Sequence, residues 1–308
     1  MTIVVTGAAG FLGVHLVKEL AAADHRVIGV DVTAPDDLVW AYLEPSRHRV
    51  RYARADVSVR GSLSDAVDEP VEALVHAAAV TSTPELEASQ PQRIVDVNVL
   101  GTLEALRFVG AAGIRRFVYL SSSGVYGESS PAEPVLESRR LQLLSLYAMT
   151  KFIGERLVAV ESREAGYSAA SARPAALYGP MERPTGVRTV MSPIYTLIHA
   201  AVAKRSVGIS RPEVRRDWTY AVDVARGLRL LVEAPGLSYD CYNLSCGKAI
   251  SLAEIADTLA GIAPGFSWHP AEAGQADIEG ARISGRGPLD ISRLGEVGFT
   301  PQYALSDG

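Results

Sequence analysis

A glycine-rich turn between a short apolar strand and an apolar helix is the feature that most limits the folds open to this chain. Residues 2–6 read Thr-Ile-Val-Val-Thr, and residues 7–13 follow at once as Gly-Ala-Ala-Gly-Phe-Leu-Gly. An apolar helical pattern then runs to about Ala22. Glycine permits a tight turn and lets the backbone approach a pyrophosphate, whose charge lies at the helix N-terminus. A plain glycine-rich turn is the alternative, but the strand–turn–helix context favours a dinucleotide site. The residues expected to line it are Gly7, Gly10, Phe11, Leu12 and Gly13.

The second apolar strand ends in an acidic residue at a distance typical of dinucleotide sites. Residues 26–31 read Arg-Val-Ile-Gly-Val-Asp, so that Asp31 closes the strand that follows the first helix. An acid at about this distance from the glycine turn accepts hydrogen bonds from the ribose hydroxyls of NAD and repels the 2′-phosphate of NADP. Val32 and Thr33 supply no arginine that could pair with such a phosphate. The pattern predicts NAD as the cofactor; the alternative is that Asp31 is a solvated loop residue.

Further apolar strands alternate with helical segments along the first half of the chain. They are expected at residues 50–55, 73–79 and 117–120. Strands that alternate with helices at this spacing indicate an α/β fold with a doubly wound, parallel Rossmann-type sheet. Ligands of such sheets bind at the carboxyl ends of the strands. His76 lies near one of these ends, either as a packed histidine or as a neighbour of the cofactor. The other residues expected beside the cofactor there are Asp56, Val57, Ala77, Ala78 and Ala79.

Tyr147 and Lys151 stand four residues apart in a segment expected to be helical, so their side chains should lie on one face. A free tyrosine titrates near pH 10 or so, which is too high for a general base at neutral pH. A cation held nearby favours the phenolate and lowers the tyrosine pKa towards the working range. This spacing also arises by chance in many helices, so the pair gains its weight from the motifs upstream.

Composition limits the classes of partner. The chain of 308 residues has a net charge of -5 and no long run of Lys or Arg, so nothing indicates binding to nucleic acid or to a membrane surface. Its two cysteines, Cys241 and Cys246, have no neighbouring histidine; they are expected to be reduced thiols, with no metal site. No apolar run approaches the roughly 18 residues of a membrane span, and no secretory leader is recognised. A soluble, cytoplasmic protein is expected.

Four motifs in a fixed order resemble one enzyme family. They are the Thr-Gly-x-x-Gly-x-x-Gly turn from Thr6, the His-x-Ala-Ala strand end from His76, the Ser-Ser-x-x-Val-Tyr-Gly stretch of residues 121–127, and Tyr-x-x-x-Lys from Tyr147. In this order they resemble the extended short-chain dehydrogenase/reductase family, in its NAD-dependent epimerase/dehydratase branch. The resemblance extends over nearly the whole chain.

This resemblance implies roles for individual residues. Tyr147 would be the general base, and Lys151 would hold the nicotinamide ribose and lower the pKa of Tyr147. Ser122, with Ser123 as the fallback, would hydrogen-bond the reacting oxygen of the substrate. Further cofactor contacts are expected at Asn98 and at the crossover residues Arg173, Pro174 and Ala176.

The resemblance also implies two interleaved lobes. An NAD-binding domain would comprise residues 1–173, with 219–250 returning to it, and a substrate-binding cap would comprise 174–218 and 251–308. Arg216 is at the position that meets a phosphate in sugar-nucleotide members of the family; the alternative is a structural salt bridge to Asp217 or another acid. Those members also have an Arg-x-Gly-Asp stretch, which residues 274–277 replace here with Gly-Gln-Ala-Asp. Arg282 or Arg286 could substitute for the missing arginine.

The implied function is NAD-dependent epimerisation at a secondary alcohol of a sugar or nucleotide sugar, through a transient keto intermediate. An NAD-dependent dehydrogenase of a free sugar, sugar acid or hydroxy acid is the second interpretation, and a catalytically idle NAD-binding sensor or scaffold is the third. Dehydration is not expected, because relatives that dehydrate have Asp-Glu where this chain has Ser123 and Gly124. Helices at about 87–112 and 147–164 are expected to pair across a homodimer, as in the family.

Overall fold

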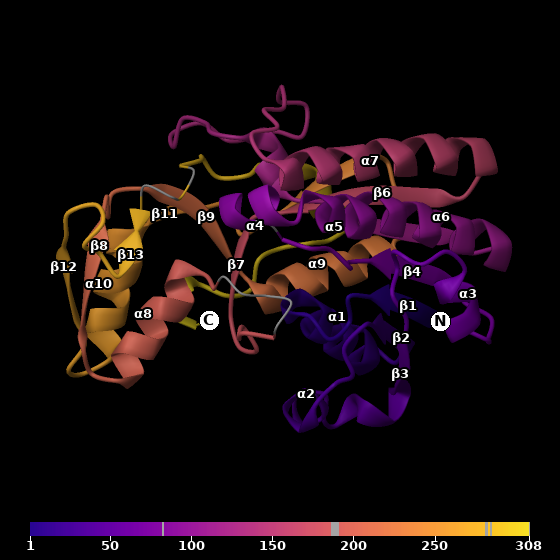
Figure 1. Cartoon of the computed structure of the whole chain (residues 1–308), viewed down its shortest axis with the longest axis horizontal. Coiled ribbons are helices and arrows are strands. Elements are labelled where there is room, and N and C mark those ends of the chain that lie inside the picture. Colours follow the sequence, from indigo (N-terminus) through magenta and orange to yellow (C-terminus); the bar gives the residue numbers. More distant parts are fainter. Residues whose placement is uncertain (82, 186–190, 281–282, 284, 308) are drawn as a thin grey trace.

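The apolar strands form one parallel sheet with helices on both faces, as Figure 1 shows for the computed structural model of the chain. The structure describes residues 1–81, 83–185, 191–280, 283 and 285–307. Within these residues, strands pair in the order β10-β6-β5-β4-β1-β2-β3, and each neighbouring pair is parallel. The predicted α/β fold class is therefore confirmed. The strands are β1 (Thr2–Thr6), β2 (Arg26–Asp31), β3 (Val50–Arg54), β4 (Ala73–His76), β5 (Arg116–Leu120), β6 (Ser168–Pro174) and β10 (Cys241–Leu244).

Each strand contributes to two cores, because successive side chains point to opposite faces of a sheet. Ile3 and Val5 pack in the core that includes α1 (Phe11–Ala22) and α9 (Ala221–Glu233). Val4 lies in the other core, which includes α3 (Ser62–Ala66), α6 (Gly101–Ala112) and α7 (Leu146–Ala165). Burying one such side chain contributes about 1.5–3 kcal/mol. Coverage of both faces explains why the central strands β1 and β4 have apolar side chains on both faces rather than an alternating pattern.

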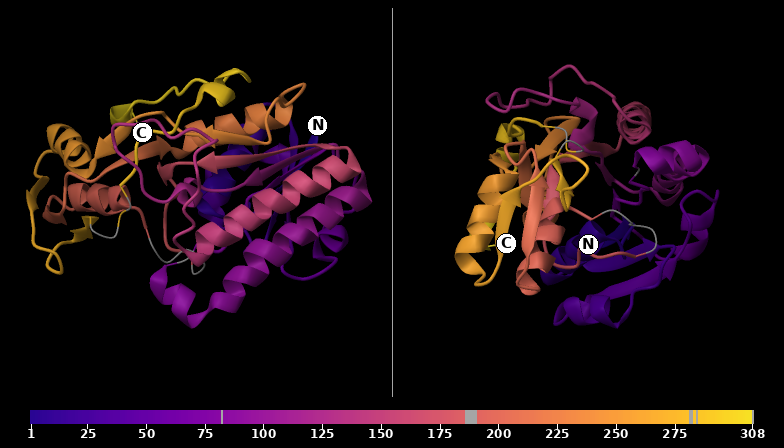
Figure 2. Two further views of the ribbon diagram at one scale, coloured as in Figure 1. Left: turned by 90° about the horizontal axis from the view of Figure 1, so that it is seen from above. Right: turned by 60° about the vertical axis from the view of Figure 1, so that its left-hand side comes forward.

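The helical region expected at about 87–112 is not one continuous helix. It consists of α4 (Pro84–Ser89), α5 (Pro91–Val95), a π-helical turn η2 (Asp96–Leu100) and α6. Gln90 interrupts it with φ -137° and ψ 48°. A residue before proline is disfavoured in the helical region, and Pro91 follows Gln90. The expectation of an unbroken helix is therefore wrong at this point, whereas α6 and α7 do lie side by side (Figure 2, left).

A second group of elements forms the lobe at the left of Figure 1. One small sheet has the order β11-β9-β7 and another the order β12-β8-β13, and α8 and α10 pack with them in a third core. Ser251 and Glu254 form a capping box at the start of α10. These elements are β7 (Ala176–Tyr178), α8 (Pro193–Val202), β8 (Ser206–Ser210), β9 (Arg215–Tyr220), β11 (Ala249–Ser251), α10 (Leu252–Ile262), β12 (Ser267–Pro270) and β13 (Ile278–Glu279).

The chain passes between the two lobes more than once. After β9 in the small lobe, α9 packs against the large sheet and β10 joins that sheet. The chain then returns to the small lobe, where β11 pairs with β9. The boundaries predicted for the two domains stay a prediction. The remaining elements are α2 (Asp37–Tyr42), α11 (Ser292–Gly295) and the short helices η1 (Ser46–Arg49), η3 (Ser123–Tyr126) and η5 (Leu305–Asp307).

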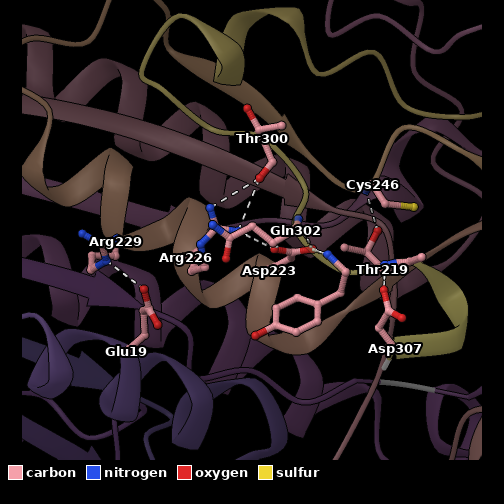
Figure 3. Close-up of polar contacts among 11 residues, drawn as sticks. Glu19, Thr219, Asp223, Arg226, Arg229, Cys246, Thr300, Gln302 and Asp307 are labelled. Carbon is pink, nitrogen blue, oxygen red and sulfur yellow. Dashed lines mark hydrogen bonds and ion pairs between the residues drawn. The ribbon is translucent and has the colours of Figure 1, made fainter.

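The C-terminal residues are held on the first turn of α9, as Figure 3 shows. Asp223 in that turn is fully buried and accepts hydrogen bonds from the backbone N–H groups of Gln302 and Tyr303 at 3.0 and 3.1 Å. Arg226 pairs with Asp223 and donates to the carbonyl oxygen of Thr300 at 3.3 Å. A buried carboxylate needs such partners. They fix this segment against the large lobe.

Candidate active site

The carboxyl ends of the large sheet open into a cleft of about 1200 Å³. A pocket for one drug-sized ligand has roughly 300–1,000 Å³, so this cleft has room for a dinucleotide and a second ligand. The predicted site residues that line it come from the ends of six strands, from α7 and from β9. They are Gly7, Gly10, Phe11, Leu12, Gly13, Asp31, Asp56, Val57, Ala77, Ala78, Ala79, Ser122, Tyr147, Lys151, Pro174 and Arg216.

The glycine turn at the end of β1 has the backbone that a pyrophosphate site requires. Gly7 has φ 69°, and a Cβ on it would lie 2.8 Å from the backbone of Ala78. A Cβ on Gly13 would collide with the carbonyl oxygen of Gly7. Gly10 is the N-cap of α1 and places no side chain over the first turn of the helix. The N–H groups in the first turn of a helix have no intrahelical acceptor, and such a turn suits an anion.

Asp31 lies at the end of β2 with its carboxylate held by the backbone. Its two oxygens accept hydrogen bonds from the N–H groups of Ala9 and Thr33, each at 3.0 Å. Burial raises the pKa of Asp31, and these N–H groups act in the opposite direction. A carboxylate has about four acceptor sites, so two remain for the hydroxyls of a ribose. Together with the glycine turn, Asp31 fits NAD.

Ser122 follows β5 and lies on the wall of the cleft. It is the N-cap of η3, where its Oγ accepts a hydrogen bond from the N–H of Gly124 at 3.0 Å. Its hydroxyl proton can still be donated to a ligand. Ser123 is buried and does not line the cleft. The geometry therefore favours Ser122 over Ser123, the fallback.

Tyr147 and Lys151 both line the cleft from the first turns of α7. Ser145 caps this helix by accepting a hydrogen bond from the N–H of Ala148 at 3.1 Å. The Nζ of Lys151 lies 5.8 Å from the centre of the Tyr147 ring and donates to the carbonyl oxygen of Leu120 at 2.7 Å. Burial lowers the pKa of Lys151 to about 7. The ammonium is thus close to the phenol, as the four-residue spacing predicted.

Three other predicted cofactor contacts lie away from the cleft wall. Asn98 is buried, and its amide accepts from the N–H and donates to the carbonyl oxygen of Val80, at 2.8 and 3.1 Å. Arg173 is buried in an ion pair with Glu155. Ala176 does not line the cleft either. From these positions the three side chains can support the wall but do not form it.

Several residues of the cleft were not foreseen from the sequence. Ala175 and Leu177, on either side of Ala176, line it, because side chains alternate along β7. Asp36 and Arg183 also line it and form an ion pair at 2.7 Å between the loop after β2 and the loop after β7. No local sequence signal indicates this pair, since its two members lie in distant parts of the chain.

Arg216 lies in the cleft, and its side chain makes no hydrogen bond or ion pair with the described part of the chain. The carboxylate of Asp217 instead accepts from the N–H of Leu289 and the hydroxyl of Thr219, at 3.1 and 3.0 Å. Arg286 is buried and donates its Nε–H to the carbonyl oxygen of Gly127 at 2.8 Å. Burial and, to a smaller extent, the nearby Arg216 lower the pKa of Arg286 to about 9.

Arg216 lines the cleft and Arg286 does not, but the two guanidinium groups are close enough to repel each other, so positive charge gathers beside the cleft at Arg216. Arg216 and Asp217 form no salt bridge among the described residues, so the structural alternative considered for Arg216 is not observed there. Arg282, the other predicted substitute for the missing arginine, lies outside the described residues.

His76 is a packed histidine. It is fully buried, shares a hydrogen bond of 2.8 Å with the hydroxyl of Thr6, and does not line the cleft. Burial lowers its pKa to about 3, so the ring is neutral. The described residues contain no cluster of His, Cys, Asp and Glu side chains that could hold a metal ion. Nor does any helix within them have the length and apolar character to cross a membrane.

Comparison with known proteins agrees with this site. The NAD dependent epimerase/dehydratase family matches residues 3–245. The chain is 29% identical to a UDP-glucose 4-epimerase of Mycolicibacterium smegmatis, over 100% of this chain and 96% of that protein. It is 30% identical to a GDP-6-deoxy-D-mannose reductase of Pseudomonas aeruginosa, over 84% of this chain and 79% of that protein.

Solved structures with a similar fold include proteins bound to NAD and a nucleotide sugar. The structure of MoeE5 in complex with UDP-glucuronic acid and NAD has a TM-score of 0.81 and 28% identity, and the match covers 100% of this chain and 96% of that one. A UDP-glucose 4-epimerase of Thermotoga maritima, at 23% identity, has the same fold with a TM-score of 0.82. The glycine turn, Asp31 and the cleft fit the cofactor that these comparisons imply. The chain therefore belongs to the NAD dependent epimerase/dehydratase family and is an NAD-dependent enzyme of the extended short-chain dehydrogenase/reductase type.

Proposed function

We propose that this enzyme epimerises a nucleotide sugar at a secondary alcohol, through a transient keto intermediate. One observation supports this above the others: Ser122, Tyr147 and Lys151 line the same cleft as the glycine turn and Arg216. A nucleotide sugar has its reacting alcohol on the sugar and its charge on the diphosphate. The cleft offers hydroxyl groups for the first and cations for the second.

The residues of the chain divide the chemistry between them. The glycine turn and Asp31 would hold NAD, which would supply reversible hydride transfer at the alcohol carbon. Tyr147 as phenolate takes the hydroxyl proton, and Ser122 donates a hydrogen bond to the oxygen as carbonyl character develops. The ammonium of Lys151, 5.8 Å from the Tyr147 ring centre, favours the phenolate.

The diphosphate is proposed to lie against Arg216, with Arg286 behind it. The relatives supply independent support, since their names and titles include UDP-glucose and UDP-glucuronic acid. An arginine with unused donors beside a second cation is suited to a bidentate contact with phosphate. Arg286 thus takes the place of the arginine missing before Asp277.

Replacing Arg216 with leucine is expected to raise the KM for a UDP-sugar roughly 10- to 100-fold, with a smaller effect on kcat, because hydrogen bonds to a charged group contribute about 1.5–3 kcal/mol. Arg286→Leu should act in the same direction. Steady-state kinetics with UDP-glucose and UDP-glucuronic acid would measure both effects. Arg205→Leu is the control, since Arg205 pairs with Asp277 and does not line the cleft. A KM that Arg216→Leu leaves unchanged would contradict the phosphate contact.

A net dehydrogenase or reductase is the second candidate. The missing Arg-x-Gly-Asp stretch favours it, because Asp277 instead pairs with Arg205 and accepts from the N–H of Gly208 at 2.9 Å. The relative that is 30% identical and is named as a reductase also favours this second candidate. Screening sugar nucleotides and free sugars separates the two: a dehydrogenase releases NADH in proportion to substrate, whereas an epimerase accumulates none.

No dehydration product is expected from any sugar nucleotide. Loss of water needs a carboxyl group that protonates the departing hydroxyl, and Ser123 and Gly124 offer none. Glu128 is exposed and does not line the cleft. Glu182 is buried, where it accepts from the N–H and hydroxyl of Ser192 at the start of α8, each at 2.7 Å. Incubation in deuterated water with mass spectrometry is the test, and a deoxy-keto product with solvent deuterium would refute the expectation.

The protein is proposed to be a homodimer that pairs through α6 and α7. Ile153, Met149 and Val160 of α7 are exposed apolar side chains on this helix pair. Ile153→Asp should therefore convert a dimer to a monomer, which light scattering after size exclusion would measure. Ile262→Asp, at a still more exposed apolar residue of α10, is the control and should leave the mass unchanged. A monomeric wild type would disprove the dimer.

A cytoplasmic location is also proposed. Cys241 and Cys246 are both free thiols, which suits a reducing compartment. Fractionation of the source cells would test it, and recovery outside the cytoplasm would refute it.

A further inference from the structure

A buried ion pair lies directly behind the catalytic residues. Arg173 donates from Nε and Nη2 to the two carboxylate oxygens of Glu155, at 2.7 and 2.6 Å. Both side chains are buried, at 5% and 7% exposure, and neither lines the cleft. Such pairs are weak evidence of added stability, because removing two charges from water offsets their attraction. The contacts of this pair indicate a different role.

Glu155 connects the two elements that bear the catalytic groups. It lies one helical turn after Lys151 on α7, and its Oε1 accepts a hydrogen bond from the hydroxyl of Ser121 at 2.5 Å. Ser121 immediately precedes Ser122. Lys151 itself donates to the carbonyl oxygen of Leu120, the residue before Ser121. Two adjacent contacts therefore hold α7 against the end of β5.

Arg173 extends these contacts to the far side of Ser122. Its Nη1 donates to the phenol oxygen of Tyr126 at 2.9 Å and to the carbonyl oxygen of Glu137 at 3.2 Å. Tyr126 is the last residue of η3, the helix that Ser122 caps. The backbone on both sides of Ser122 is thus fixed through the same buried pair.

Among the described residues, the titratable neighbours of Lys151 include Glu155, one helical turn away on α7. Others are Tyr119 on β5, Tyr147 on α7 and His76 on β4, whose pKa burial lowers to about 3. Burial lowers the pKa of Lys151 to about 7, while Glu155 raises it. An opposite charge within about 4–6 Å shifts a pKa by about one to three units.

We propose that the Arg173–Glu155 pair is a positioning device, which fixes α7 against the end of β5 and places one negative charge behind Lys151. This inference rests on the roles proposed for Ser122, Tyr147 and Lys151. Glu155 and Arg173 act through these residues and touch neither substrate nor cofactor.

The test is the pH dependence of NAD binding, measured by calorimetry from pH 5 to 10. Glu155→Gln keeps an acceptor for Ser121 but removes the charge, so Lys151 should lose its proton at lower pH. The midpoint at which NAD affinity falls is expected to move down by about one to three units. Turnover at pH 8 should fall at least tenfold. A midpoint equal to that of the wild type in a folded variant would overturn the proposal.

A second variant separates this role from folding. Glu155→Gln leaves Arg173 buried without its partner, whereas Glu155→Gln with Arg173→Met removes both charges and retains apolar volume. The double variant should melt near the wild-type temperature and still show the lowered midpoint. If both variants fail to fold, or if the folded double variant has the wild-type midpoint, the pair is structural only.

The control is an ion pair away from the cleft, between Glu19 on α1 and Arg229 on α9, whose N–O distance is 2.9 Å. Figure 3 draws this pair. Glu19→Gln with Arg229→Met should leave the midpoint unchanged. Tyr147→Phe, measured in parallel, shows whether a negative result contradicts the proposed chemistry or only the positioning role. If Tyr147→Phe retains its activity, the proposed chemistry fails; if only the midpoint is unmoved, the positioning role fails.

Discussion

Replacing Tyr147 with phenylalanine is expected to lower turnover by roughly two to four orders of magnitude, the range for loss of a general base. Phenylalanine keeps the ring, so α7 and its contacts should persist. Lys151 keeps its hydrogen bond to the carbonyl oxygen of Leu120 and its place in the cleft. The affinity for NAD is therefore expected to change by no more than a few-fold. Single-turnover kinetics and calorimetry would separate these two effects.

Tyr167→Phe is the matched control for this experiment. Tyr167 follows α7 directly, but it does not line the cleft and its hydroxyl has no partner among the described residues. It should retain wild-type turnover. A Tyr147→Phe enzyme with most of its activity would show that another group removes the proton. Loss of NAD binding in the same variant would instead indicate that the phenol has a role in holding the cofactor.

The wild-type enzyme is expected to bind NAD about a hundredfold or more tightly than NADP, and Asp31→Ala should remove most of this preference. A carboxylate that faces a phosphate is unfavourable by several kcal/mol, and a factor of ten in affinity corresponds to about 1.4 kcal/mol. The carboxylate of Asp31 cannot turn away easily, because the N–H groups of Ala9 and Thr33 hold its two oxygens. Arg183 lies in the same cleft, but Asp36 pairs with it at 2.7 Å.

Titrating NAD and NADP into the wild type and into Asp31→Ala at pH 8 measures the two affinities and therefore the preference. Burial raises the pKa of Asp31, so protonation begins at a higher pH than for an ordinary aspartate. The preference for NAD should accordingly weaken as the pH falls and the repelling charge is lost. Asp37→Ala, in the first turn of α2 and outside the cleft, is the control. Equal affinities of the wild type for NAD and NADP would mean that Asp31 does not contact the ribose.

Local chemistry explains why much of the fold and cofactor cleft could be predicted. The turn of residues 7–13 needs glycine, because its backbone conformation and close approaches exclude a Cβ, and that requirement is visible in the sequence. Apolar strands alternating with helices indicate a parallel sheet, whose carboxyl ends must meet at one edge. Asp31 and Ala77 lie at that edge for this reason. Tyr147 and Lys151 share a face because α7 is a regular helix.

Tertiary structure decided which neighbours of these residues point into the cleft. The sequence ranked Ser122 above Ser123, and in the structure the turn into η3 leaves Ser122 on the cleft wall and buries Ser123. The sequence also associates Arg173 with the cofactor, yet its side chain turns inward to Glu155. Local patterns do not determine the direction of a side chain in an irregular turn or at the last residues of a strand.

Contacts between segments that are distant along the chain were the hardest to predict from the sequence. Arg286 stands beside Arg216 although the two are far apart along the chain, and the sequence could only name it as one of two substitutes. Asn98 lies in the π-helical turn η2, and its amide exchanges hydrogen bonds with the distant residue Val80. Spacing along the chain determines contacts within one helix or strand. Contacts between elements depend on how the whole sheet and its two lobes pack, which no local spacing encodes.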